Sequence, residues 1–168
     1  MNDHTPSDVE GKDVTITLDS TTNVFELIGP DMRADLIQSV REDGWVGLTD
    51  ELGERGVDQL VAFLATSADI ETRLAPSLRV DLFWHAFVLR TKPYADFCAA
   101  LGSFVHHVPD RGSHSPAEGR AVLARTKEAI SAAGYQIDPE FWPSESGADC
   151  SADCSQCHAG CTDSPVKK

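Results

Sequence analysis

The chain has 168 residues, enough for one domain with a substantial core but hardly for two. Asp and Glu number 27 against 14 Lys and Arg, which gives a formal net charge of −13 and argues against nucleic-acid binding, because such a field repels a phosphate backbone. No segment approaches the roughly 18–20 apolar residues of a membrane-spanning helix. The first residues also lack the basic and apolar regions of a secretory signal. We therefore expect no membrane embedding and a cytoplasmic location.

The N-terminal half predicts helices after an irregular start. Residues 1–12 are polar and unpatterned, which indicates disorder. Residues 14–18 alternate between apolar and polar side chains and predict a short strand. Apolar side chains at helical spacing predict an amphipathic helix over residues 31–43 and a second helix over residues 54–67.

The middle of the chain predicts two consecutive helices. Residues 78–90 are dense in large apolar side chains, and the length of this segment favours a helix over a strand. Thr91 is a suitable N-cap for a short helix through residue 101, and Gly102 would end it. This short helix would carry Tyr94 and Cys98 one turn apart on the same face.

A further helix and an aromatic connector follow. Ser115-Pro116-Ala117-Glu118 combines an N-cap, a proline in the first turn and a capping-box glutamate, so it predicts a helix that runs to Gly134. Residues 135–143 are rich in aromatic side chains and are expected to lie across the helical core.

Side chains that can bind a metal ion or exchange protons gather in the middle of the sequence. On a helix, Asp81 and His85 lie four residues apart and share a face. A carboxylate beside an imidazole can provide two metal ligands, or one ligand and the group that orients it, or an acid–base pair. Cys98 and the pair His106-His107 follow in the next helix and the loop after it, so all of them could converge on one site.

Each of these residues also has a structural explanation. His85 follows Trp84 on an apolar helix and could be a core histidine with satisfied hydrogen bonds. Cys98 could be a small buried hydrophobic residue. The pair His106-His107 could cap the preceding helix or bind loop carbonyls. The sequence therefore allows both a metal or catalytic site and these structural roles for the same residues.

Several of these residues also form a longer pattern, with an Asp-x-x-Trp-His stretch, a Tyr-x-x-x-Cys step, a glycine and a terminal His-His-x-Pro. The pattern spans residues 81–109 and comprises Asp81, Trp84, His85, Tyr94, Cys98, Gly102, His106, His107 and Pro109. It resembles the glycine-rich domain-containing protein-like family, although Phe87 stands where many members have a second histidine. The resemblance implies a helical domain in a family without a defined biochemical role.

Four cysteines crowd the end of the chain, at Cys150, Cys154, Cys157 and Cys161. Four thiolates are the ligand set of a closed tetrahedral zinc site or of an iron–sulfur cluster. In a reducing compartment, clustered cysteines are more often metal ligands or redox-active groups than stable disulfides. Zinc is the expected ion, with copper(I) and an iron–sulfur cluster as alternatives. The tail could also be disordered with free thiols, or be the modified segment of a peptide precursor.

Together these patterns predict a mostly α-helical, small single-domain bundle over residues 13–143, with a disordered or metal-organised cysteine-rich tail over residues 144–168. The favoured function is a non-catalytic zinc-binding protein, possessing a first site at the four tail cysteines and a second, central site at Asp81, His85, Cys98 and His107. The alternative is a small metalloenzyme in which His85, Cys98 and His107 hold the ion and Asp81 orients His85 or acts as a base. The acidic surface is compatible with a protein partner.

Overall fold

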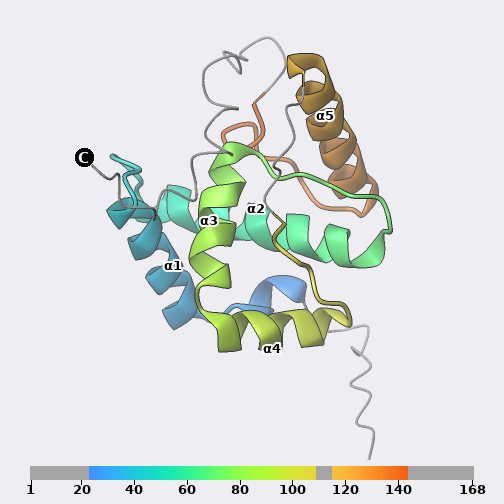
Figure 1. The fold of residues 1–168 in the computed structure, drawn as a ribbon. Coiled ribbons are helices and arrows are strands. Elements are labelled where there is room, and N and C mark those ends of the chain that lie inside the picture. Colours follow the sequence, from blue (N-terminus) through green and yellow to red (C-terminus); the bar gives the residue numbers. More distant parts are fainter. Residues whose placement is uncertain (1–22, 109–114, 144–168) are drawn as a thin grey trace, which may run out of the picture.

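The computed structural model describes residues 23–108 and 115–143, and in these ranges the chain is helical and has no strand (Figure 1). The elements of the same ranges are a short 3-10 helix η1 (Val24–Leu27) and the α-helices α1 (Pro30–Glu42), α2 (Asp50–Asp69), α3 (Leu78–Val88), α4 (Thr91–Leu101) and α5 (Pro116–Ala132). The predicted mostly α fold is confirmed. The strand expected over residues 14–18, the irregular start and the cysteine tail lie outside the described residues.

Local capping sequences set several helix boundaries as expected. The backbone N–H of Glu118 donates to the Ser115 hydroxyl, and the Glu118 carboxylate accepts from the backbone N–H of Ser115, which completes the predicted capping box of α5. Gly102 and Gly134 follow α4 and α5 at φ +80 and +89, a conformation that glycine adopts without steric cost. Pro30 occupies the first turn of α1, where its missing N–H is not needed.

Two predicted helix starts are wrong. Helix α2 begins at Asp50, four residues before the predicted start, because the Thr49 hydroxyl accepts a hydrogen bond of 3.1 Å from the backbone N–H of Leu52. This cap stabilises a first turn that lacks the apolar pattern of the rest of the helix. Thr91 is the first residue of α4, and Arg90 takes the cap position without a capping side chain.

Helix α2 is the centre of the core. It packs against η1, α1, α3 and α5, while α3 also packs against α1 and α4. In Figure 1, α3 crosses α2, and α4 lies at the opposite end of α3 from α5. Burial of apolar side chains along these contacts is the main force that holds the helices together. The largest fully buried side chains are Trp142, Phe63, Phe83, Phe87, Phe141, Leu36, Leu60, Leu64, Ile130, Val40, Val57 and Val61.

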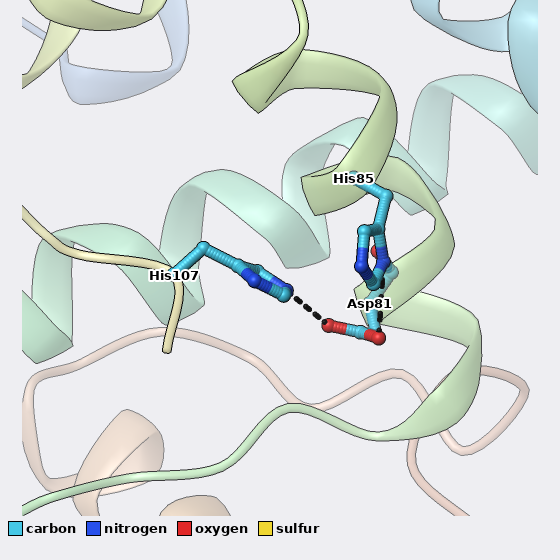
Figure 2. Close-up of side chains that lie close together, drawn as sticks. All are labelled: Asp81, His85 and His107. Atoms are coloured by element: carbon cyan, nitrogen blue, oxygen red, sulfur yellow. Dashed lines mark hydrogen bonds and ion pairs between the residues drawn. The ribbon is translucent and has the colours of Figure 1, made fainter. Parts of the chain in front are cut away.

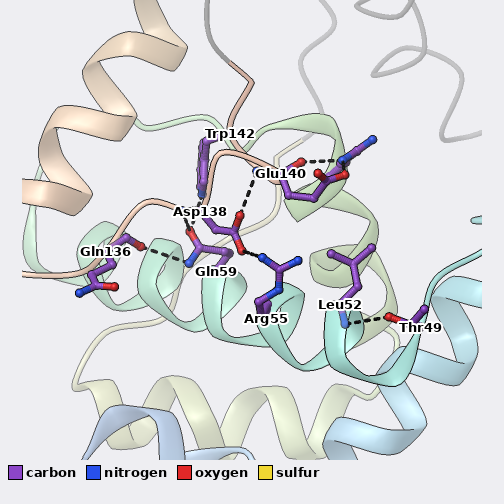
Figure 3. Close-up of polar contacts among 9 residues, drawn as sticks. Thr49, Leu52, Arg55, Gln59, Gln136, Asp138, Glu140 and Trp142 are labelled. Carbon is purple, nitrogen blue, oxygen red and sulfur yellow. Dashed lines mark hydrogen bonds and ion pairs between the residues drawn. The ribbon is translucent and has the colours of Figure 1, made fainter.

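The aromatic connector after α5 lies across the core, as predicted, and Gln59 of α2 binds it (Figure 3). The Gln59 side-chain carbonyl accepts hydrogen bonds from the Trp142 indole N–H at 2.8 Å and from the Asp138 backbone N–H at 3.3 Å. Its amide group donates to the carbonyl of Gln136 at 3.1 Å. A single buried side chain therefore satisfies the polar groups of the connector where it enters the core.

Among the described residues, no helix combines the length and the apolar character that crossing a membrane would require.

Candidate metal centre

The first two residues of the site lie on consecutive turns of α3. Asp81 and His85 are four residues apart, so their side chains lie on the same face, as the sequence predicted (Figure 2). His85 Nδ1 is 3.1 Å from Asp81 Oδ2 and 3.0 Å from the Asp81 backbone carbonyl oxygen. Because a carbonyl oxygen only accepts, the second contact places a proton on Nδ1. The other nitrogen, Nε2, then carries the free lone pair of the ring.

The third residue, His107, comes from the segment that follows α4 (Figure 2). Its Nε2 atom lies 3.1 Å from Asp81 Oδ1, so the two imidazoles bind opposite oxygens of one carboxylate. The ring centroids of His85 and His107 are 4.3 Å apart. The side chains of Asp81 and His107 are only 14% and 15% exposed, whereas that of His85 is 41% exposed, so solvent reaches the group on the His85 side.

Burial and hydrogen bonding act in opposite directions on the charges of this group. Burial by itself would raise the pKa of Asp81, because it disfavours the charged carboxylate. Hydrogen bonds from His107 and His85 and the charges of these rings outweigh burial, so the pKa of Asp81 is lowered. The hydrogen bond to Asp81 raises the pKa of His85 against the smaller effect of burial. Asp81 therefore stays ionised well below neutral pH, and His85 holds its proton more firmly than a free imidazole does.

The three side chains fit a divalent transition-metal ion. One ligand atom from each lies within 4.8 Å of the other two. The 3.1 Å between Asp81 Oδ1 and His107 Nε2 is close to the roughly 3.3 Å between two ligands of a tetrahedral ion with bonds of about 2.0 Å. Two imidazoles and one carboxylate form a ligand set that zinc accepts and that non-haem iron(II) also uses. An ion bound here would take the place of the proton between the His107 ring and the carboxylate, and Nε2 is the nitrogen of His85 that is available to a metal.

The structure brings Asp81, His85 and His107 together but does not add Cys98 to them. Cys98 is a free thiol in α4 with 1% of its surface exposed, and it is not part of the group whose ligand atoms converge. This position corresponds to the alternative of a small buried hydrophobic residue. His85 is too exposed to be the buried core histidine of the other alternative. The tail cysteines Cys150, Cys154, Cys157 and Cys161 lie outside the described residues.

Of the two adjacent histidines, the predicted central site includes His107, and this is the one that lies against Asp81. Residues 104–108 alternate in burial: Phe104, His106 and Val108 are exposed, whereas Val105 and His107 are partly buried. Alternate side chains of an extended segment point to opposite sides, so only one histidine of the pair can face Asp81. The apolar Val105, two residues before His107, is the signal in the sequence that marks His107 as the inward residue.

A family model described as UCP032817-like matches residues 44–140, which include the whole candidate site. The expected membership of the glycine-rich domain-containing protein-like family is therefore wrong. The motif pattern over residues 81–109 lies inside this match, and the buried contacts among Trp84, Tyr94 and Cys98 give such a pattern a structural reason. Neither the curated proteins nor the solved structures contain a match to the chain.

Proposed function

Since this chain belongs to the UCP032817-like family, whose description names no activity, we propose its function from the geometry of the site. The protein binds one divalent transition-metal ion, with zinc as the preferred ion, through Asp81, His85 and His107. The observation that carries this proposal is the convergence of two imidazoles on the two oxygens of a single, largely buried carboxylate. The cytoplasmic location expected from the sequence belongs to the same proposal, and the thiolates of the tail, predicted as the first metal site, remain a prediction.

A second candidate function is that of a small metalloenzyme. Three protein ligands leave one position of a tetrahedral ion open, which is the ligand number of catalytic zinc sites. The 41% exposure of the His85 side chain favours this candidate, because water and a small substrate could reach the ion from that side. In such an enzyme the ion would act as a Lewis acid. Cys98, included in this alternative by the sequence, is replaced by Asp81 as the third ligand.

A full-length chain in which the tail thiols are removed tests the proposal. This tail-serine chain carries Cys150→Ser, Cys154→Ser, Cys157→Ser and Cys161→Ser. We expect it to bind one equivalent of zinc in a calorimetric titration. Cobalt(II) in place of zinc should give visible absorption without the sulfur-to-metal charge-transfer bands of thiolate ligands. If only the unsubstituted chain bound zinc, the metal would belong to the tail and the proposed central site would be refuted.

The affinity of the tail-serine chain for zinc should rise between about pH 6 and about pH 8. Zinc competes with protons for the imidazole nitrogens, and the hydrogen bond to Asp81 raises the pKa of His85 above 6.5, so this competition extends toward neutral pH. Asp81, with a pKa below 3.8, stays ionised throughout and adds no change. Titrations at several pH values check the direction, and an affinity that fell with rising pH would contradict it.

Zinc affinity should rise with pH, but the free energy of unfolding of the metal-free chain should fall as the pH rises through the folded-state pKa of His85. The raised pKa of His85 contributes stability that is fully present below pH 6.5 and is lost as the pH rises through the folded-state value. The lowered pKa of Asp81 contributes stability that is present above pH 3.8 and is lost as the pH falls through its folded-state value. Denaturant titrations at several pH values measure the free energy of unfolding. Those without zinc report the effect of the two pKa shifts, and those with zinc add the effect of metal binding.

A further inference from the structure

Two buried side chains connect the helix that carries Asp81 and His85 to the segment that carries His107. The indole N–H of Trp84 in α3 donates a hydrogen bond of 3.0 Å to the hydroxyl oxygen of Tyr94 in α4. The Tyr94 hydroxyl in turn donates to the backbone carbonyl of Val105. Trp84 and Tyr94 are 6% and 3% exposed; the hydrogen bond between them is buried, and the one to Val105 is partly buried. We call this pair of hydrogen bonds the Trp84–Tyr94 relay.

The relay ends two residues before His107. Because Val105 and His107 lie on the same side of the segment, fixing the Val105 carbonyl also fixes the direction from which the His107 side chain leaves the backbone. Trp84 acts on the imidazole ring as well. Its ring packs edge-on against that of His107, with centroids 4.4 Å apart and planes at 68°. Trp84 therefore positions His107 in two ways: it contacts the imidazole ring directly and holds the backbone near it through Tyr94.

The Tyr94 hydroxyl is suited to a permanent role of this kind. Burial raises the pKa of Tyr94 and outweighs the hydrogen bond from Trp84, which lowers it, so the hydroxyl keeps the proton that it donates to Val105. The phenol ring also packs edge-on against Phe87 and Phe104, with centroid distances of 5.2 and 5.5 Å. These contacts hold the ring in place.

We propose that Trp84 and Tyr94 are positioning residues of the metal site, which hold His107 at the place where it completes the ligand set of Asp81 and His85. This inference rests on the proposed function. Among the described residues, the segment after α4 has no regular secondary structure, so its path depends on side-chain contacts. On the side that faces the metal site, the relay holds this segment at the carbonyl of Val105. The guanidinium of Arg73 binds the carbonyl of Val108 at 3.2 Å on the exposed side.

Tyr94→Phe in the tail-serine chain tests the proposal, because it removes only the hydroxyl and keeps the ring. The affinity for zinc should fall about tenfold, at the lower end of the 10–100-fold losses found when groups that orient metal ligands are removed. The visible spectrum of bound cobalt(II) should also change, since His107 would no longer be held in one orientation. Trp84→Phe should act in the same direction, because it removes the N–H of the relay and narrows the ring that contacts His107.

Trp142→Phe is the matched control for these variants. It also removes a buried indole N–H hydrogen bond, the one to Gln59 at 2.8 Å, but Trp142 belongs to the connector across the core, where its ring packs against Phe63. It should lower the free energy of unfolding while leaving the zinc affinity and the cobalt spectrum of the folded protein unchanged. Unfolding measured on each metal-free variant shows that binding is compared between folded proteins.

The outcomes separate this inference from the proposed function. If the tail-serine chain binds zinc and Tyr94→Phe binds it equally well, with the same cobalt spectrum, the positioning role is refuted and the metal site stands. An equal loss of affinity in Trp142→Phe would refute the positioning role in the same way, because it would reflect global stability. A tail-serine chain that binds neither zinc nor cobalt would refute the site itself.

Discussion

His107→Ala in the tail-serine chain is expected to weaken zinc binding by more than about 100-fold, a larger loss than that caused by removing a group that only orients a ligand. The substitution removes the nitrogen that lies 3.1 Å from Asp81 Oδ1 and leaves two protein ligands, too few for a stable site of this kind. Calorimetry with zinc measures the affinity, and competition with a chelator extends the range for the tighter protein.

His106→Ala is the matched control, because the two histidines are neighbours in the sequence and differ only in their direction. The side chain of His106 is on the exposed side of the segment, where its ring lies 4.7 Å from that of Phe104, and it is not part of the converging group. Its removal should change the zinc affinity by less than about twofold. Equal losses of zinc affinity in His106→Ala and His107→Ala would show that neither histidine acts as a specific ligand.

The helices were predictable wherever a local signal in the sequence marks their ends. The capping box at Ser115 and the glycine after α4 depend on residues within one turn, so nothing distant can override them. The start of α2 was missed because its first turn has no apolar pattern, and only the hydrogen bond from Leu52 to Thr49 shows that it is helical. The short η1 was missed because a 3-10 turn of four residues has too few positions for a periodic pattern.

The site was predictable in the part that lies on one helix. Asp81 and His85 share a face of α3 because helical geometry requires it, and this half of the site follows from spacing alone. The other half depends on tertiary contacts. Whether His106 or His107 faces Asp81 is decided by how the segment leaves α4, and Cys98 is directed into the core by the same helix that carries Tyr94. The alternation with Val105 indicates which histidine faces inward, but spacing alone does not show that the segment lies beside Asp81 or that Cys98 does not reach the site.

Two glycines inside α2 lie where neighbouring helices approach it closely, which the sequence alone did not indicate. Glycine within a helix normally lowers its stability, so Gly53 and Gly56 argue against the helix in which they lie. The structure gives the reason for both: a β-carbon at Gly53 would lie 2.6 Å from the side chain of Ile37, and one at Gly56 would lie 2.5 Å from the ring of Phe83. α1 and α3 approach α2 so closely at these points that even a methyl group would force the neighbouring side chain to move.

Gly56→Ala is therefore expected to destabilise the fold by about 2 kcal/mol. Overpacking costs about 3 kcal/mol, because the β-carbon would meet ring atoms of Phe83 at 2.5 Å and of Phe141 at 2.9 Å. Both rings are fully buried, and a rigid ring in a filled core cannot move aside at little cost. The higher helix propensity of alanine offsets about 1 kcal/mol of this cost. Urea titration of the metal-free chain measures the difference in the free energy of unfolding.

Gly119→Ala provides the control with the opposite sign. Gly119 lies inside α5 on the exposed surface, where a β-carbon would have no atom within 4 Å, so only the propensity remains and the substitution should stabilise the chain by about 0.5–1 kcal/mol. The same chemical change would then act in opposite directions in two helices of one molecule. A Gly56→Ala protein as stable as the parent would mean that α2 and α3 are not packed as closely as the contact with Phe83 requires. In that case the position of α3 against α2, which presents Asp81 and His85 to His107, would need to be revised.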